Sequence, residues 1–198
     1  MPNQKEGDDL EKASTMVLLD RAKAGSTAAR DVLYQRYLPR LKRWARGRIP
    51  IGARGLHETD DIVQDVLMRT LHKVDQFDPQ HSGAFLAYMR RAVRNRIAEV
   101  ARSPERRRRV ELSDEEFPDS GPSPLQSLIE ADNAKRFDEA LERLGPVEQA
   151  AIIARGEWGM SYDEIARELG KPSTDAARMT VNRAVARLAQ EMADLRRA

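Results

Sequence analysis

The residues best suited to chemistry in this sequence lie near its C-terminal end, on the polar side of an expected helix. The set comprises Asp175, Arg178, Met179, Asn182 and Arg183. Arginine and asparagine side chains make paired hydrogen bonds to the edges of guanine and adenine. Further along the helix, arginines suit contacts with phosphate groups. The segment therefore predicts a surface that reads duplex DNA, while a purely structural amphipathic helix is the alternative.

Two helices must position these side chains, and turn signals mark their ends. Ser161 and Glu164 have the spacing of a capping box, which begins a helix. Gly170 stands where a left-handed helix stop belongs, and Pro172 prevents the helix from continuing. Ser173 is the next start signal, and apolar residues recur at helical spacing after it. The stretch is thus expected to form a helix-turn-helix.

Composition limits the class of protein. The chain has 198 residues, a formal net charge of +2, no cysteine and three histidines. Disulfides and thiolate metal sites are thereby excluded, and the histidines lack a metal-ligand spacing. Neither a metal nor a cofactor is expected. No apolar run is long enough to span a membrane and no signal peptide pattern is present, so we expect a soluble, cytoplasmic protein.

The length allows one large or two small domains, and a break in the pattern favours two. Residues 1–15 are polar and charged and are expected to be disordered. Helical patterning covers 16–102 and resumes over 125–198. Between them, 103–124 is rich in arginine, then in proline, serine and acidic residues, which is typical of a linker. The expected fold is all-α, with two small helical domains joined by a flexible linker.

Two helices of the first domain carry unusual polar faces. One is expected from Thr59 to about Val74, with Thr59 as its cap and acidic residues where the helix dipole favours them. Its exposed face is expected to carry Asp61, Gln64, Asp65 and Met68. The other helix, Ala84 to about Arg102, carries Arg90, Arg91, Arg94 and Asn95 largely outside its apolar stripe. A solvated surface would explain both faces, and a basic partner helix or nucleic acid is the functional alternative.

Three segments resemble bacterial RNA polymerase sigma factors. The stretch TDDIVQDVLMRTL is similar to a region 2 helix of these proteins, and AFLAYMRRAVRNRIAEVAR is similar to the helix after it. The stretch LGPVEQAAIIARGEWGMSYDEIARELG resembles region 4, and Thr174 to Leu188 resembles its recognition helix. Nothing between these regions resembles a third folded one, as in the small sigma factors of the extracytoplasmic-function (ECF) type. The resemblance covers about Met16 to Met192.

The resemblance implies a promoter-specificity subunit with no catalysis of its own. Region 2 would dock on the β′ clamp of core RNA polymerase through Asp60, Asp61, Gln64, Asp65 and Met68. It would open the −10 element with His81, Arg90, Arg91, Arg94 and Asn95. Region 4 would read the −35 element through Asp175, Arg178, Met179, Asn182 and Arg183, with Ser173 and Thr174 on phosphate. The implied partners are core polymerase, including its β flap, and promoter DNA; an anti-sigma factor is a further partner that stays open.

Two departures from the family pattern bear on these sites. The turn GKPSTDAAR is slightly longer than usual, so individual base contacts are not assigned. Phe85 and Tyr88 are the only aromatic residues of the melting helix, so strand opening is expected to rest more on arginine than on stacking.

Two other functions compete with this interpretation. A freestanding helix-turn-helix regulator would explain the C-terminal motif but not the two helices similar to region 2. An enzyme acting on nucleic acid would need a metal cluster, a phosphate-binding glycine loop or a nucleophile paired with a base, and none is evident in the sequence. The freestanding regulator is therefore the main alternative.

Overall fold

A computed structural model describes residues 9–46, 56–102 and 124–197, without the side chains of 56–58, 101 and 124–131. Every regular element in these ranges is helical, which confirms the all-α expectation. The elements are α2 (Thr15–Lys23), α3 (Thr27–Arg46), α4 (Leu56–His72), the 3₁₀ turn η2 (Val74–Gln76), α5 (Ala84–Arg102), α7 (Pro124–Arg143), α8 (Pro146–Ile152), the π turn η3 (Ile153–Glu157), α9 (Tyr162–Glu168) and α10 (Thr174–Arg197). Apart from Pro124, which begins α7, the expected linker lies outside the described residues.

Local signals set the helix ends of the C-terminal motif as the sequence predicts. The Ser161 hydroxyl accepts from the Glu164 amide at 3.2 Å, and the Glu164 carboxylate accepts from the Ser161 amide at 2.9 Å. Gly170 ends the motif's first helix with a φ of 60°, in the left-handed region. The Ser173 hydroxyl accepts from the Ala176 amide at 3.1 Å and so begins α10. The predicted helix-turn-helix is therefore present.

The N-terminal stretch is more ordered than its composition suggests. A helical turn covers 9–12, and Leu10 is only 2% exposed, within the core. The Arg36 guanidinium donates to the carbonyl oxygens of Glu11 and Ala13, each at 2.9 Å. The expectation of disorder over 1–15 is therefore wrong for 9–15. Burial of Leu10 and the hydrogen bonds from Arg36 hold this polar segment against the rest of the N-terminal helices. Residues 1–8 lie outside the described residues.

The start of α4 also differs from the expectation. This helix begins at Leu56, three residues before Thr59, and the Thr59 side chain is buried at 2% exposure. Thr59 is therefore an interior residue of the helix and not its cap. Its side chain is buried, which local cap signals do not reveal.

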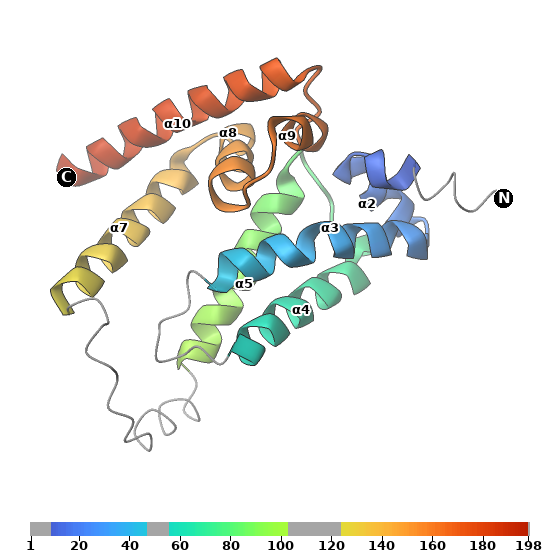
Figure 1. The fold of residues 1–198 in the computed structure, drawn as a ribbon, viewed down its shortest axis with the longest axis horizontal. Coiled ribbons are helices and arrows are strands. Elements are labelled where there is room, and N and C mark those ends of the chain that lie inside the picture. The colour runs from blue at the N-terminus through green and yellow to red at the C-terminus, as the bar shows by residue number, and fades with distance from the viewer. Residues whose placement is uncertain (1–8, 47–55, 103–123, 198) are drawn as a thin grey trace.

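The helices form an N-terminal unit, α2 to α5, and a C-terminal unit, α7 to α10, and the two pack against each other (Figure 1). Their buried apolar side chains belong to one continuous cluster. At the junction, the rings of Tyr37 and Trp158 meet edge to face with centroids 5.6 Å apart. Two helical domains were predicted; this shared core between them was not.

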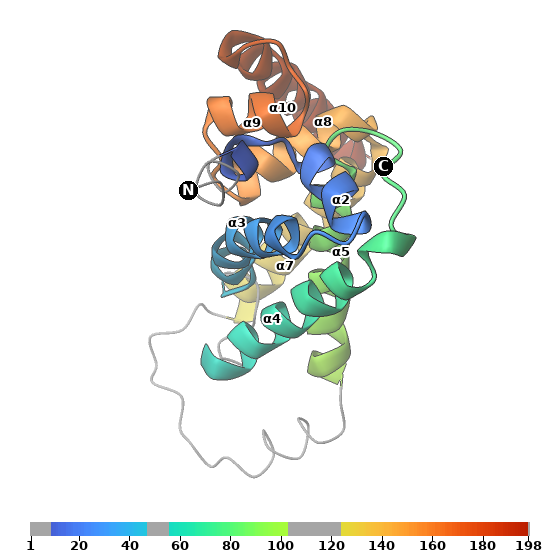
Figure 2. The ribbon, with the colours of Figure 1, turned by 90° about the vertical axis from the view of Figure 1, so that its right-hand side faces the viewer.

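The two units leave their outermost helices at opposite ends of the molecule. Both views place α10 at one end and α4 at the other, with α3 and α5 between them (Figures 1 and 2). The exposed faces of α4 and α10 therefore meet solvent at opposite ends of the molecule. Among the described residues, no helix is long and apolar enough to cross a lipid bilayer.

Gly83, which precedes α5, lies close to Ala150 and Leu169 of the C-terminal unit, and this close packing is part of the shared core. Its φ is 86°, and a Cβ atom there would lie 2.4 Å from Cβ of Ala150 and 2.8 Å from Cδ2 of Leu169. Gly25 also has a positive φ, 95°, but a Cβ there would meet nothing within 4 Å. The two glycines thus separate the cost of backbone strain from the cost of a clash between the units.

We expect Gly83→Ala to destabilise the protein more than Gly25→Ala. Gly25→Ala should cost about 1 kcal/mol for the left-handed conformation alone, and Gly83→Ala should cost a further 1–3 kcal/mol or so for overpacking. Urea unfolding of both variants measures the two free energies. Equal losses would show that the approach of Gly83 to the C-terminal unit is loose.

Candidate nucleic-acid interface

The first turns of α10 carry an exposed polar face held by a buried apolar stripe. Ala177, Val181, Ala184 and Leu188 are buried and fix the rotation of the helix. The opposite side exposes the residues singled out from the sequence: Asp175, Arg178, Met179, Asn182 and Arg183. Met179 is 56% exposed, an unusual position for a large apolar side chain. The structure therefore brings these five residues together on one accessible surface.

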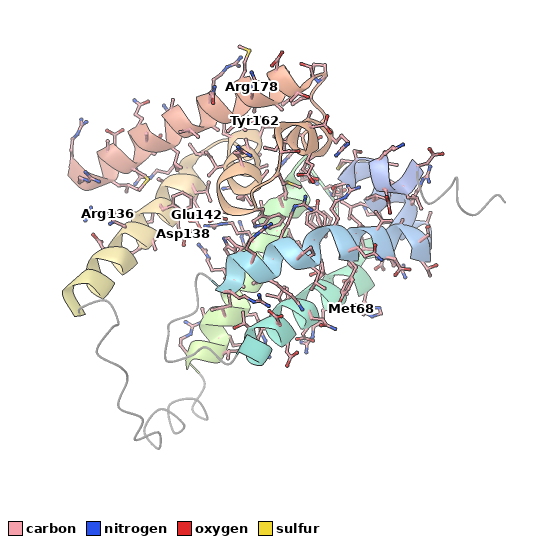
Figure 3. The ribbon with its side chains drawn as sticks, viewed as in Figure 1. Met68, Arg136, Asp138, Glu142, Tyr162 and Arg178 are labelled. Atoms are coloured by element: carbon pink, nitrogen blue, oxygen red, sulfur yellow. The ribbon has the colours of Figure 1, made fainter. Side chains whose placement is uncertain are left out.

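Tyr162, which the sequence analysis did not single out, supports this face. The Arg178 guanidinium carbon lies 5.5 Å from the centre of its ring, and that of Arg155 lies 4.7 Å from it (Figure 3). Arg178 also pairs with Asp175 at 3.3 Å. A cation is attracted to the face of an aromatic ring, which favours this position of the guanidinium. Tyr162 thus orients Arg178. In the sequence, the place of Tyr162 directly after the cap Ser161 could have indicated this role.

The outer face of α4 is also accessible, but its acidic residues differ in their environment. Asp61, Gln64 and Met68 are exposed, with Met68 at 42% (Figure 3). Asp65 pairs with Arg69 along the helix at 2.7 Å. The spacing of these side chains places them on one stripe. This stripe is the surface that the sequence analysis expected.

Asp60 lies apart from that stripe, facing α3. Its carboxylate contacts Lys42 at 3.2 Å and Arg46 at 2.7 Å. Burial alone would raise the pKa of Asp60, but the hydrogen bonds and charges of Arg46 and Lys42 outweigh it and lower the pKa. Asp60 therefore ties α4 to α3 and positions the stripe.

The cations of α5 divide between two sides of the helix. Arg91 and Asn95 are exposed, as expected. Arg90 is only 6% exposed: its Nε donates to Glu157 at 2.6 Å, and its guanidinium also pairs with Asp138. The prediction that Arg90 lies on an accessible face is wrong, because its partners are 48 and 67 residues further along the chain. Burial lowers the pKa of Arg90, and these carboxylates raise it by more.

Arg94 shares the inward side with Arg90 but is more accessible. Its guanidinium contacts Asp138 at 3.0 Å and Glu142 at 3.4 Å, and its side chain is 34% exposed. Asp138 and Glu142 belong to α7 of the C-terminal unit, on the side that faces α5 (Figure 3). The four residues grouped from the sequence thus form an outward pair and an inward pair.

The two aromatic residues of α5 also differ in exposure: one is buried and the other is exposed. Phe85 is buried against Tyr37, with ring centroids 5.0 Å apart. Tyr88 is 44% exposed and leans on Phe77 at 5.1 Å. Tyr88 shares the outward side with Arg91 and Asn95 by helical spacing. His81 lies half-buried in the preceding loop, with Nδ1 3.0 Å from the carbonyl oxygen of Ser82.

A buried carboxyl group lies at the junction of α9 with α2 and α3. Glu168 is 3% exposed, and its Oε2 accepts from the hydroxyls of Thr15 and Tyr37, the latter at 3.0 Å. Its other carboxyl oxygen, Oε1, is buried without a hydrogen-bond partner. Burial raises the pKa of Glu168 above its ordinary value, more than the two hydroxyls lower it. Glu168 therefore links the two units through neutral partners.

Comparison with known families decides the identity. The family model for sigma-70 region 2 matches residues 33–108, and that for sigma-70 region 4 matches residues 134–188. These matches fall on the N-terminal and C-terminal units and cover more than half of the chain. The chain belongs to the ECF sigma factors of the sigma-70 family. A freestanding regulator would account for the second match alone, so that alternative is not supported.

Curated relatives agree with this assignment. The chain is 29% identical over 189 residues to the ECF RNA polymerase sigma factor BldN of Streptomyces coelicolor, covering 94% of this chain and 69% of the relative. It is 28% identical over 179 residues to the ECF RNA polymerase sigma factor SigD of Mycobacterium bovis, covering 89% and 82%. A solved structure titled CnrH in complex with the cytosolic domain of CnrY matches with a TM-score of 0.38 and 24% identity, covering 88% and 94%. As an ECF sigma factor, this protein binds core RNA polymerase, directs it to promoters through regions 2 and 4, and is not an enzyme.

We expect Glu168 and Glu164, both on α9, to give opposite pH dependences of stability in this sigma factor. The pKa of Glu168 is raised above its ordinary 4.5, so stability is full below that value and falls as pH rises through the folded pKa. Burial raises the pKa of Glu164, but the Ser161 amide and Arg40 lower it by more, so its contribution is lost on acidification instead.

Thermal melts from pH 4 to 9 measure this contrast. Glu168→Gln keeps an acceptor for Thr15 and Tyr37, so its Tm should exceed that of the parent at alkaline pH and approach it in acid. Glu164→Gln should lower the Tm at neutral pH and converge with the parent in acid. A uniform offset for Glu168→Gln at every pH would contradict the raised pKa.

Proposed function

We propose that this ECF sigma factor docks on the β′ clamp through α4, opens the −10 element with α5 and reads the −35 element with the first turns of α10. The observation that carries the proposal is the accessibility of the α4 and α10 faces at opposite ends of the molecule (Figure 2). Each face can meet its own partner without excluding the other. Because core polymerase is the partner, we place the site of action in the cytoplasm.

The α4 stripe has the composition of a docking surface. Asp61 supplies an accessible negative charge, and Met68 supplies an adaptable apolar contact beside it. Gln64 lies between them by helical spacing and can both donate and accept hydrogen bonds. Such a stripe suits a basic, partly apolar helix on the clamp. Asp60 supports it indirectly, since its contacts with Lys42 and Arg46 hold α4 on α3.

The outward side of α5 suits a separated DNA strand. Tyr88 offers an aromatic face on which an unpaired base can stack, and Phe77 holds it in place. Arg91 and Asn95 follow on the same side and can contact phosphate or base edges. His81 lies in the loop that leads into this helix and suits a contact with a displaced base. Because Phe85 is buried, Tyr88 is the one of the two aromatic residues of α5 that can stack on a base, which agrees with strand opening that rests mainly on arginine.

The α10 face suits the major groove of duplex DNA. Arg178 and Asn182 are one helical turn apart and can contact neighbouring bases. Tyr162 and Asp175 restrict the Arg178 side chain before it binds. Ser173 and Thr174 lie at the helix start, where amide groups attract phosphate.

A second contact with polymerase is proposed for the C-terminal unit. A cavity of about 380 Å³ opens between α7, α8, η3 and α10. It is lined by Ala134, Phe137, Asp138, Ile152, Gly156, Glu157, Val185 and Leu188. Its mostly apolar wall suits an apolar segment of the β flap.

An anti-sigma factor is a further possible partner of the exposed faces of α4 and α10. Competition between such a factor and core polymerase for this protein would reveal it.

Charge reversal on α4 tests the docking surface. The Asp61→Arg, Asp65→Arg double variant should bind core polymerase at least tenfold more weakly, because like charges would face a basic clamp helix. Pull-down and titration with core polymerase measure the loss. Asp31→Arg, an exposed change on α3, is the control and should bind as the parent does. Equal binding by the double variant would remove α4 from the docking interface.

Two arginines of α10 should behave differently in promoter binding. Arg178→Ala should cost about 1–3 kcal/mol and relax the preference at one base position, since Arg178 is placed to contact base edges. Arg183→Ala should weaken binding to all sequences alike and reduce the salt dependence by about one counterion, as loss of a phosphate contact does. Holoenzyme binding to a library of −35 duplexes at several salt concentrations measures both. If Arg178→Ala weakens every sequence equally, its assignment to base reading is wrong.

A further inference from the structure

We propose that Met179 of α10 reads the C5-methyl group of a thymine in the −35 element, so that this sigma factor prefers a T·A pair at one position. The proposal rests on the proposed reading of the −35 element by α10 and names the chemistry of one contact within it. Thymine is the one base that presents an apolar group in the major groove, since the other bases offer hydrogen-bond donors and acceptors there. A methionine at the centre of the reading face is suited to that group.

The rotation of α10 places Met179 at the centre of its outward face. Ala177 and Val181 are buried, and Met179 lies two residues from each of them. Two residues turn an α-helix by about 200°, so Met179 points almost directly away from the buried stripe. Asp175 and Asn182, one turn before and one turn after it, are exposed on the same side. When this face enters the major groove, Met179 is therefore the side chain closest to the base edges.

Met179 is more exposed than a large apolar side chain usually is. At 56% it is the most exposed large hydrophobic residue in the described part of the chain, ahead of Val185 at 51% and Tyr88 at 44%. Its neighbours on the outward face are polar or charged, so packing against them removes little apolar surface from water. A groove that places a methyl group beside Met179 would bury its side chain, and burial of apolar surface favours binding.

The side chain of Met179 also disfavours the other base edges. Its thioether sulfur is only a weak acceptor, and the side chain has no donor. Opposite an amino group or a carbonyl oxygen it would displace water without replacing the hydrogen bond, which weakens binding. Selectivity for thymine therefore comes from an attractive contact and from a penalty on the alternatives. The flexible side chain of methionine lets the methyl contact form without a fixed placement of the helix.

The other side chains of the face leave its centre to Met179. Arg178 is drawn to one edge, where its guanidinium carbon lies 5.5 Å from the centre of the Tyr162 ring and Nη1 lies 3.3 Å from the Asp175 carboxylate. Asn182 lies close to Met179 on the outward face by helical spacing and can pair with N6 and N7 of adenine. An apolar reader and an amide reader side by side suit neighbouring A·T pairs. The face is thus expected to select a −35 element that contains thymine.

Replacement of thymine by uracil tests the contact, because deoxyuridine differs from thymidine only in lacking the C5-methyl group. The probes are duplexes with the −35 sequence that the holoenzyme selects from a library randomised at this element, in which each thymine of either strand is replaced in turn. At one position the replacement should weaken holoenzyme binding about threefold to fourfold, the effect of one buried methyl group. Deoxyuridine in the flanking sequence is the DNA control and should change nothing.

Three variants assign the effect to one side chain. Met179→Gln keeps the length of the side chain but makes its end polar, so the ratio of thymine to uracil affinity at that position should fall to about one. Met179→Leu stays apolar and should retain most of the ratio. Ala189→Gln is the matched control, because Ala189 is exposed further along the same helix. It should keep the ratio of the parent.

Two results would overturn the methyl contact and leave the proposed function intact. One is an unchanged ratio in Met179→Gln, which would show that another side chain meets the methyl group. The other is a clear base preference at the −35 element with no thymine in it, or with equal binding of thymine and uracil at every position. A holoenzyme with no base preference anywhere in the element would instead remove the reading of −35 by α10, and the methyl contact with it.

Discussion

The burial of the Arg90 guanidinium is the interaction on which the arrangement of the two units depends. A buried cation is tolerated only when carboxylates compensate for the loss of water, and removing one partner of such a pair typically costs about 3–5 kcal/mol. Glu157 and Asp138 supply that compensation from the C-terminal unit. Arg90 therefore requires η3 and α7 to lie against α5, and the apolar contacts of the junction are compatible with that arrangement.

The π turn η3 makes these contacts geometrically possible. It widens the backbone over Ile153–Glu157, and the Trp158 amide then donates to the Ile153 carbonyl at 3.0 Å. Glu157 and Trp158 are adjacent in sequence, yet one pairs with Arg90 and the other packs on Tyr37. The turn thus positions both the ion pair of Glu157 with Arg90 and the aromatic contact of Trp158 with Tyr37. Irregular turns of this kind are frequent at functional positions.

Local signals explain why much of the fold follows from the sequence. Ser161, Gly170 and Ser173 act on backbone groups within a few residues, so the ends of α9 and α10 are predictable. The order of Leu10 and the burial of Thr59 depend on distant helices, which no local pattern reports. The same distinction separates the sites. Exposure of the α10 face follows from its apolar stripe. Arg90 lies one turn after Leu86 on the buried face of α5, but its burial there depends on distant carboxylates that no local pattern reports.

Arg90 and Arg94 show that one helix can carry both a tightly held and a loosely held ion pair. An exposed ion pair contributes only about 0–1 kcal/mol, so Arg94 alone does not hold the units together. Its contacts with Asp138 and Glu142 are partly exposed, so water and salt screen them. The pairs of Arg90 with Asp138 and Glu157 are costly to separate, which makes the arrangement of the two units specific. The tightly held arginine of α5 therefore fixes how the two units pack, while the loosely held one adds little to that packing.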